Sequence, residues 1–215
     1  MSPEQRRATI VEAALSVAQR KGLAGTTVRD VAAEMGSSSG LIHHYFASMD
    51  DVLAAAFEKV AARDLATTVA AMAAASDPAA ALVAFFQAYA PVEADWAFQL
   101  WLDAWAEAAR RPAVRATSAR LNLAWHAHLR DTIVLGVRDG WFACADPSGA
   151  AWRILSLIDG LALQVVAHRT TLRRSDVVSW AALAAERELG LAPGSLDVHE
   201  TATGALRRRQ HASGA

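Results

Sequence analysis

A run of short, rigid polar side chains between residues 37 and 45 has the types and spacing to contact a polyanion. Three serines at 37–39 are followed by His43, His44 and Tyr45. Hydroxyl, imidazole and phenol groups can meet base edges and phosphates without immobilising long flexible stems. Gly40 interrupts this run, and a glycine inside a helix costs about 1 kcal/mol relative to alanine. Such a cost is easiest to understand where the backbone must come close to another surface.

Two short predicted helices position this polar run. Thr27 followed by Asp30 indicates a helix N-cap with an acid at the third helical position, and Gly36 ends the helix that they begin. A preceding amphipathic helix, with apolar residues at helical spacing over 10–18, ends at Gly22. Two helices joined by a tight turn at Gly36 form a helix-turn-helix, whose second helix enters the major groove of duplex DNA.

The charge balance predicts that any nucleic-acid contact is local. The 215-residue chain has a formal net charge of −1, and residues 1–47 carry a net charge of +1. We therefore expect modest phosphate affinity and a shallow salt dependence, with Arg29 and the positive ends of helices supplying much of the anchoring. The predicted DNA contacts are Thr27, Arg29, Ser37, Ser38, Ser39, Gly40, Leu41, His43, His44 and Tyr45.

Helical signals continue through the rest of the chain. Residues 49–75 contain neither Gly nor Pro, which predicts one stiff helix from about 48 to 75. No segment alternates with the period of two that marks a strand. Further helices are expected at 79–90, 93–110, 113–138, 148–172 and 176–189. The sequence therefore predicts an all-α protein, with a helix-turn-helix module at 1–47, a connecting helix at 48–75, a helical ligand-binding and dimerisation domain at 76–190 and a disordered tail at 191–215.

The segment 27–53 resembles the N-terminal signature of the tetracycline-repressor-like (TetR/AcrR) family of bacterial transcriptional regulators. The matching positions are Thr27, Val31, Ala32, Gly36, Ser38, Gly40, Tyr45, Phe46, Ser48 and Leu53. The residues for which the resemblance implies phosphate or base contacts are Thr27, Ser38, His44 and Tyr45. It also implies that Phe46 packs in the core of the module. A homodimeric, ligand-responsive repressor, released from double-stranded operator DNA by a small-molecule inducer, is the function that follows.

Two positions depart from the pattern of that family. The family's usual lysine just inside the fourth helix, a phosphate anchor, is Met49 here, and the usual first tyrosine of the recognition helix is His43. The pair His43–His44 can also be read as surface residues without a role. A zinc site is the poorer reading, because adjacent residues on a helix do not share a face and no cysteine flanks them.

All seven tryptophans lie beyond residue 95. Trp101 and Trp105 belong to one helical stripe of bulky side chains, and Trp125 belongs to another. These rings can form a core, or they can line a ligand cavity in a helical bundle. A row of polar residues at four-residue spacing, Gln99, Asp103 and Glu107, lies beside the first stripe. This row can be a solvated face of the helix, or its acids can combine with the indole rings to attract a cation. The predicted effector-binding residues are Trp101, Asp103, Trp105, Trp125 and His128. The segment WLDAWAEAARRP at 101–112 resembles the C-terminal domain of the choline-sensing, betaine-pathway regulators of the family, which implies a quaternary or amine ligand.

The predicted helix at 148–172 has almost no polar face, so it must be covered on all sides. With the helix at 176–189 it can form an isologous four-helix interface with a second subunit. Leu157, Gly160 and Leu161 are expected at or near that interface, where Gly160 permits close approach of two helices. Asp159 either hydrogen-bonds within the interface or faces the ligand cavity.

A helical enzyme and a dimeric small-molecule carrier without DNA binding are the competing functions. The chain has no G-x-S-x-G, phosphate-binding glycine loop, H-E-x-x-H or Cys/His cluster, so we expect no catalytic residue, cofactor or metal. A single cysteine, Cys144, excludes an intramolecular disulfide and is interpreted as a small packing residue more readily than as a redox sensor. We find neither a signal peptide nor a run of about 18 apolar residues free of charge and proline, and we expect a cytoplasmic protein.

Overall fold

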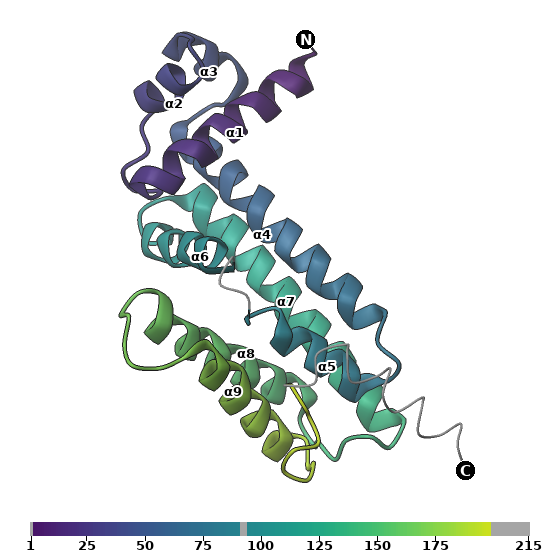
Figure 1. Ribbon diagram of the computed structural model, residues 1–215. Helices are drawn as coiled ribbons and strands as arrows, with labels where there is room; N and C mark the ends of the chain where they lie inside the picture. The colour runs from purple at the N-terminus through teal and green to yellow at the C-terminus, as the bar shows by residue number, and fades with distance from the viewer. Residues whose placement is uncertain (1, 91–93, 199–215) are drawn as a thin grey trace, which may run out of the picture. The chain divides into compact units, whose positions relative to one another are not determined.

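The computed structural model describes residues 2–90 and 94–198, which form nine α-helices and no strand (Figure 1). The helices are α1 (Pro3–Lys21), α2 (Val28–Glu34), α3 (Ser39–Tyr45), α4 (Met49–Ala73), α5 (Pro78–Gln87), α6 (Ala94–Ala108), α7 (Pro112–Arg138), α8 (Pro147–Val166) and α9 (Arg174–Glu188). The predicted all-α fold is confirmed. The chain divides into two compact units, with residues 1–67 and 92–125 in unit 1 and residues 68–91 and 126–215 in unit 2.

Helices α1, α2 and α3 pack together in unit 1, as the helix-turn-helix prediction requires (Figure 1). Ser2 and Gln5 cap α1 reciprocally, and Thr27 and Asp30 do the same for α2. These boxes satisfy backbone N–H groups that would otherwise lack partners at the helix starts. The small core of the three helices contains Ile10, Ala14, Val17, Leu23, Val31, Ile42 and Phe46, all buried. Phe46 therefore packs where the family resemblance implied.

Unit 1 also contains α6, which packs on the N-terminal part of α4. The Trp101 ring of α6 meets the Phe57 ring of α4 edge to face, with 4.8 Å between their centroids. Arg111 adds a polar connection, because its guanidinium contacts Glu107 at 2.5 Å and Asp50, in the first turn of α4, at 2.6 Å. Unit 1 thus joins segments that the predicted boundaries at 47 and 75 assign to different domains.

Unit 2 is built around α5, α8 and α9, and α8 lies along α9 (Figure 1). Asp77 caps α5 and Asp146 caps α8, each followed by a proline at the first helical position. The core of these helices contains Leu82, Phe85, Phe86, Ile154, Ile158, Val178 and Ala185. Helix α8 ends at Val166, six residues before the predicted end at 172. There Arg169 takes a φ of 47°, a left-handed conformation that no α-helix continues through.

The start of the predicted disordered tail is ordered against α9. Glu186 is buried, and its two carboxylate oxygens accept backbone hydrogen bonds from Gly194 at 3.0 Å and Leu196 at 2.8 Å. Leu196 is buried as well. The prediction of disorder was therefore wrong for 191–198, because a distant buried carboxylate provides the partners that composition does not reveal. Residues 199–215 lie outside the described part of the chain.

By length and composition, α8 alone among the described helices could cross a membrane. It contains Arg153, whose guanidinium contacts Glu188 of α9 at 2.8 Å, and Asp159. A third of its apolar stretch is buried inside the protein. The core helix of a soluble protein meets the same criterion, so α8 is weak evidence for a membrane span.

Candidate nucleic-acid interface and effector region

Helix α3 presents a polar surface that the protein itself does not cover. Ile42 is 1% exposed and anchors α3 to the core of the module. On the other side, Ser37, Ser38, Gly40, His43 and His44 are exposed, as are Thr27 and Arg29, and Ser39, Leu41 and Tyr45 are half-buried. Eight of the ten predicted contact residues thus lie in α3 or in the turn just before it, and Thr27 and Arg29 lie at the start of α2. Their contact with DNA stays a prediction.

The two glycines around α3 have different reasons to be glycine. Gly36 has a φ of 59°, which the tight turn before α3 requires and which other residues rarely adopt. Gly40 lies inside α3 without a positive φ, and a Cβ placed on it would meet nothing closer than the Ser38 Oγ at 3.8 Å. Nothing inside the protein therefore excludes a side chain at position 40.

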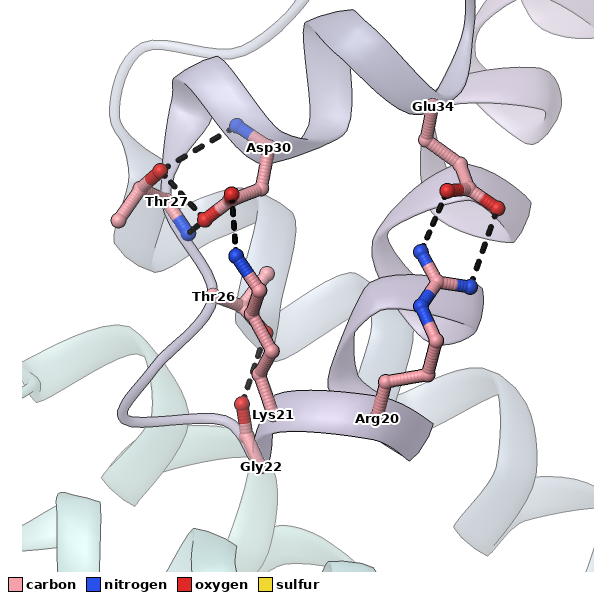
Figure 2. A network of polar contacts seen from close by, with 7 residues as sticks. All are labelled: Arg20, Lys21, Gly22, Thr26, Thr27, Asp30 and Glu34. Atoms are coloured by element: carbon pink, nitrogen blue, oxygen red, sulfur yellow. Dashed lines mark hydrogen bonds and ion pairs between the residues drawn. The ribbon is translucent and has the colours of Figure 1, made fainter.

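Ion pairs between α1 and α2 neutralise two of the module's basic side chains (Figure 2). Arg20 contacts Glu34 at 2.5 Å, and Lys21 contacts Asp30 at 2.5 Å. The Lys21 ammonium, together with the Thr27 hydroxyl, lowers the pKa of Asp30 to about 2. The hydrogen bond from Arg20 likewise lowers the pKa of Glu34. These cations hold α2 on α1 and contribute little positive field to a phosphate.

Arg7 of α1 supports α3 directly, a role that sequence reasoning missed. Its guanidinium donates to the carbonyl oxygen of Tyr45 and lies 4.1 Å from the centroid of the Phe46 ring. No local pattern identifies this contact, because 38 residues separate Arg7 from Tyr45. Among the described basic residues of the module, Arg6 and Arg29 have neither a side-chain hydrogen bond nor an ion pair.

Asp103 contacts the DNA-binding module. Its Oδ2 accepts a hydrogen bond from the backbone N–H of Leu23 at 2.9 Å, and its Oδ1 accepts one from the Gln99 side chain at 3.2 Å. A Cβ at Gly22 would lie 2.9 Å from this Oδ2, so the close approach needs the glycine. Both carboxylate oxygens are therefore used within unit 1, and the proposed role of Asp103 in binding an effector has no support from this geometry.

The other predicted effector residues fall in both units. In unit 1, Trp101 and Trp105 have ring centroids 5.8 Å apart, and Trp125 is buried. In unit 2, His128 is exposed and lines an open pocket of about 420 Å³ between the ends of α4, α5 and α7. The structure thus pairs Trp101 with Trp105 in unit 1, whereas His128 belongs to unit 2. Their role in effector binding stays a prediction.

Sequence reasoning left two roles open for Asp159, and the structure gives it a defined partner. The Tyr89 hydroxyl, just beyond the end of α5, donates to Asp159 Oδ1 at 3.1 Å. Burial raises the pKa of Asp159 to about 7, and the hydrogen bond from Tyr89 opposes this only in part. The same burial, with the neighbouring carboxylate, raises the pKa of Tyr89 well above its usual value.

Helices α8 and α9 leave large apolar side chains exposed. Leu157 is 38% exposed and Trp180 is 53% exposed, and Trp152 and Leu183 are similarly open. Gly160 is exposed, and a Cβ on it would meet no atom within 4 Å. Leu161 is half-buried. Thus α8 is not covered on all sides within the chain, and its apolar surface is available to a partner.

Two family models match the chain. Residues 10–56 match the model described as bacterial regulatory proteins of the tetR family, and residues 78–190 match the C-terminal model of BetI-type transcriptional repressors. The first match spans α3 and its turns. The second spans α5 to α9 and covers more than half of the chain.

Several relatives bear the description HTH-type transcriptional regulator BetI. The protein of Paraburkholderia xenovorans is 36% identical over 169 residues, which span 75% of this chain and 82% of the relative. That of Rhizobium meliloti is 31% identical over 163 residues, or 75% of this chain and 77% of the relative. The match to the Paraburkholderia phymatum protein, 36% identical over 116 residues, spans 52% of this chain and 59% of the relative.

Solved structures of similar proteins agree with the fold and the family. A regulator from Saccharomonospora viridis, in complex with choline, superposes with a TM-score of 0.77 at 25% identity over 86% of this chain and 98% of that one. A regulator from Pseudomonas aeruginosa PAO1 gives a TM-score of 0.76 at 27% identity over 87% of this chain and 91% of that one. With an exposed recognition helix, two matching family models and these relatives, the chain belongs to the TetR family of transcriptional regulators, with a BetI-type C-terminal domain.

Proposed function

We propose that this protein is a cytoplasmic homodimeric repressor that binds a near-palindromic operator through α3 and leaves it when a small-molecule effector binds. The exposed polar face of α3 carries the DNA part of the proposal. Its serines, histidines and tyrosine have no covering element, and Gly40 is a helix-weakening residue that only an external surface explains.

The dimer follows from the apolar surface of α8 and α9. Leu157, Trp152 and Trp180 are large apolar side chains exposed on α8 and α9, which an interface would cover, and Gly160 allows two backbones to approach. A two-fold axis through this surface would pair α8 and α9 with their copies in a four-helix bundle. One recognition helix from each subunit then explains an operator with two half-sites about one duplex turn apart, or slightly more.

Helix α6 offers a route from an effector to the DNA-binding module. The Asp103 carboxylate holds the backbone of Leu23 at the end of α1, and Arg111 connects the end of α6 to Asp50 at the start of α4. An effector that displaces α6 would therefore change the setting of the recognition helix. A coupling of about 1–3 kcal/mol, or roughly 5–150-fold in operator affinity, is typical of such regulators.

The effector class is argued from acid and aromatic side chains and from the similar regulator that binds choline. We propose an alkylammonium compound. A dimeric carrier without DNA binding is the competing function, and the unexplained Gly40 and polar face of α3 favour the repressor.

Selection from random duplex DNA, followed by gel-shift titration, tests the proposal. We expect enrichment of a near-palindromic sequence that binds one dimer. Choline binding is then titrated with and without that operator, with tryptophan fluorescence as the signal. By reciprocity the operator must weaken choline binding by the factor by which choline weakens operator binding. Recovery of no preferred sequence would refute DNA regulation, and equal choline affinity in both titrations would refute the switch.

A further inference from the structure

A buried carboxyl group in unit 2 has one oxygen without a donor. Asp159 keeps some exposed surface as a residue, whereas its carboxyl group lies deep among its neighbours. Oδ1 accepts the hydrogen bond from Tyr89. Within the described residues neither a donor nor an ion pair is found for Oδ2, which is not fully shielded from solvent and can therefore be reached by a ligand. An isolated buried carboxylate is costly unless a cation or further donors compensate it.

Asp103 and Glu107 of α6 and the acids of the 420 Å³ pocket already have partners. Asp103 accepts from Leu23 and Gln99, and Glu107 contacts Arg111 at 2.5 Å. The acids of the 420 Å³ pocket are satisfied as well, since Asp131 pairs with Arg130, Asp139 with Arg138, and Asp77 caps α5. A cation that binds any of these acids would have to displace an existing hydrogen bond or ion pair. At Oδ2 of Asp159 it would displace no contact within the described residues.

The surroundings of Asp159 suit an alkylammonium group. The Tyr89 and Phe85 rings lie 5.8 Å apart between centroids and are tilted by 58°. Aromatic faces beside a buried carboxylate attract an organic cation through the ring quadrupole and through charge in a low dielectric. Helix α9 also contributes a charged side chain to this cluster, Arg174. Its Nη1 donates a hydrogen bond to the Tyr89 carbonyl oxygen at 3.4 Å.

From this cluster we infer that Asp159, with the rings of Tyr89 and Phe85, is the anionic subsite that binds the ammonium head of the effector. The inference rests on the proposed function and moves the effector's charge partner from Asp103, the sequence-based candidate, to Asp159. Tyr89 is a positioning residue that orients Oδ1 and leaves Oδ2 for the ligand. In contrast to an uncharged ligand, the ammonium group compensates the buried negative charge.

Binding at this subsite is linked to proton release. Because burial raises the pKa of Asp159 to about 7, about half of the carboxyl groups are protonated at neutral pH. A cation favours the ionised form, so its binding expels the remaining proton into solvent. The apparent affinity should therefore rise with pH, and should be about tenfold weaker at pH 6 than at pH 8.

Calorimetric titration of the full-length protein with choline tests the subsite. The titrations are repeated near pH 6, 7 and 8, in phosphate and in HEPES, because the difference in buffer ionisation heat reports the protons released. The uncharged isostere 3,3-dimethyl-1-butanol replaces choline in a parallel series. We expect proton release near pH 7 with choline and none with the alcohol, which should bind at least tenfold more weakly at pH 8.

Three variants separate the subsite from a general effect on the fold. Asp159→Asn keeps an acceptor for Tyr89, and should weaken choline binding at least tenfold at pH 8 and abolish both the pH dependence and the proton release. Tyr89→Phe keeps the ring but removes the hydrogen bond that lowers the pKa of Asp159. The pH at which the choline affinity rises should therefore shift upward. Glu188→Gln removes the same charge from the exposed Arg153 pair and should bind choline as the wild type does.

Unchanged choline affinity in Asp159→Asn, or a loss in Asp103→Asn with none in Asp159→Asn, would overturn the subsite. Wild-type protein that binds neither choline nor tetramethylammonium at millimolar concentration would overturn the ammonium assignment. Operator selection is independent of both outcomes, so failure of the subsite and failure of the proposed repressor are distinguishable.

Discussion

Helices α3 and α8 each contain a glycine whose Cβ position is open, whereas the Cβ positions of Gly136 in α7 and of Gly149 in the first turn of α8 are occupied by other side chains. A Cβ at Gly160 would meet no atom within 4 Å, and one at Gly40 would make only an ordinary contact. A Cβ at Gly136 would lie 2.1 Å from the Phe142 ring, and one at Gly149 would lie 2.0 Å from Asp146. At Gly136 the space is filled by a buried ring, so this glycine serves the core, whereas at Gly149 it is filled by the exposed carboxylate that caps α8. A glycine whose space is open, in a helix that it weakens, indicates a surface used by a partner.

The neighbours of the two glycines with open Cβ positions differ in polarity, and that difference indicates two kinds of partner. Around Gly40 the exposed side chains are serines and histidines, which suit phosphates and base edges. One turn before Gly160, Leu157 is exposed beside Ser156, and Trp152 is exposed further toward the start of α8. Leu157 and Trp152 suit another apolar surface. The comparison predicts that substitutions of exposed polar side chains in α3 affect DNA binding and leave assembly intact, and that substitutions in α8 affect assembly.

The largest expected effect comes from Gly160→Glu. A buried, unpaired charge in an apolar interface costs several kcal/mol, so the variant should sediment as a monomer or precipitate. Analytical ultracentrifugation measures the change, and Gln19→Glu, which adds the same charge to exposed α1, is the matched control. A clean dimer of Gly160→Glu would remove α8 from the interface.

Removal of a polar side chain from α3 should have the next largest effect. Tyr45→Ala or His44→Ala should weaken operator binding by about 1–3 kcal/mol and leave the dimer intact. Gel-shift titration measures the affinity, and sedimentation measures the assembly. His168→Ala, an exposed histidine of unit 2, is the control. Wild-type affinity in both α3 variants would place this helix outside the groove.

Gly136→Ala tests the internal class of glycine. Because Phe142 is buried and its ring occupies the position of the new Cβ, the substitution should lower the free energy of unfolding by about 1–3 kcal/mol. Urea denaturation followed by tryptophan fluorescence measures this. An unchanged midpoint would show that an occupied Cβ position does not identify a packing glycine in this protein.

Gly40→Ala should have effects of opposite sign on folding and on binding. Alanine should raise the free energy of unfolding by up to about 1 kcal/mol, because α3 loses a flexible residue. The new methyl group should weaken operator binding if DNA comes close to the backbone here. Thermal unfolding and gel-shift titration on the same sample separate the two, and a more stable variant with full operator affinity would contradict the close approach.

The smallest expected effect concerns salt dependence. Arg29 is exposed and without an ion pair, so Arg29→Ala should reduce the slope of log affinity against log salt by about 1. Arg20 already pairs with Glu34, so Arg20→Ala should leave the slope nearly unchanged. Equal slopes for the two variants would mean that the ion pairs of α1 and α2 do not decide which cations reach phosphate.

Much of the fold could be predicted from the sequence because its signals are local. The Thr27–Asp30 capping box and the turn glycine Gly36 act within four residues, so α2 and α3 were predicted nearly to the residue. The absence of glycine and proline from residues 49–75 is also a local signal, and it predicted α4. The boundary of α8 was less accurate, because the residues after Val166 have no strong breaker in the sequence.

The partners of the charged side chains were decided by tertiary structure. Eighty residues separate Asp103 from Leu23, and seventy separate Asp159 from Tyr89. Helical spacing shows on which face of a helix an acid lies. It does not show which residue of a distant segment will be its hydrogen-bond partner. The sequence by itself therefore determined the helices, the recognition helix and its polar face through short-range backbone preferences. Only the tertiary structure decided which acid holds the DNA-binding module and which one pairs with Tyr89, because hydrogen bonds depend on distances that folding alone sets.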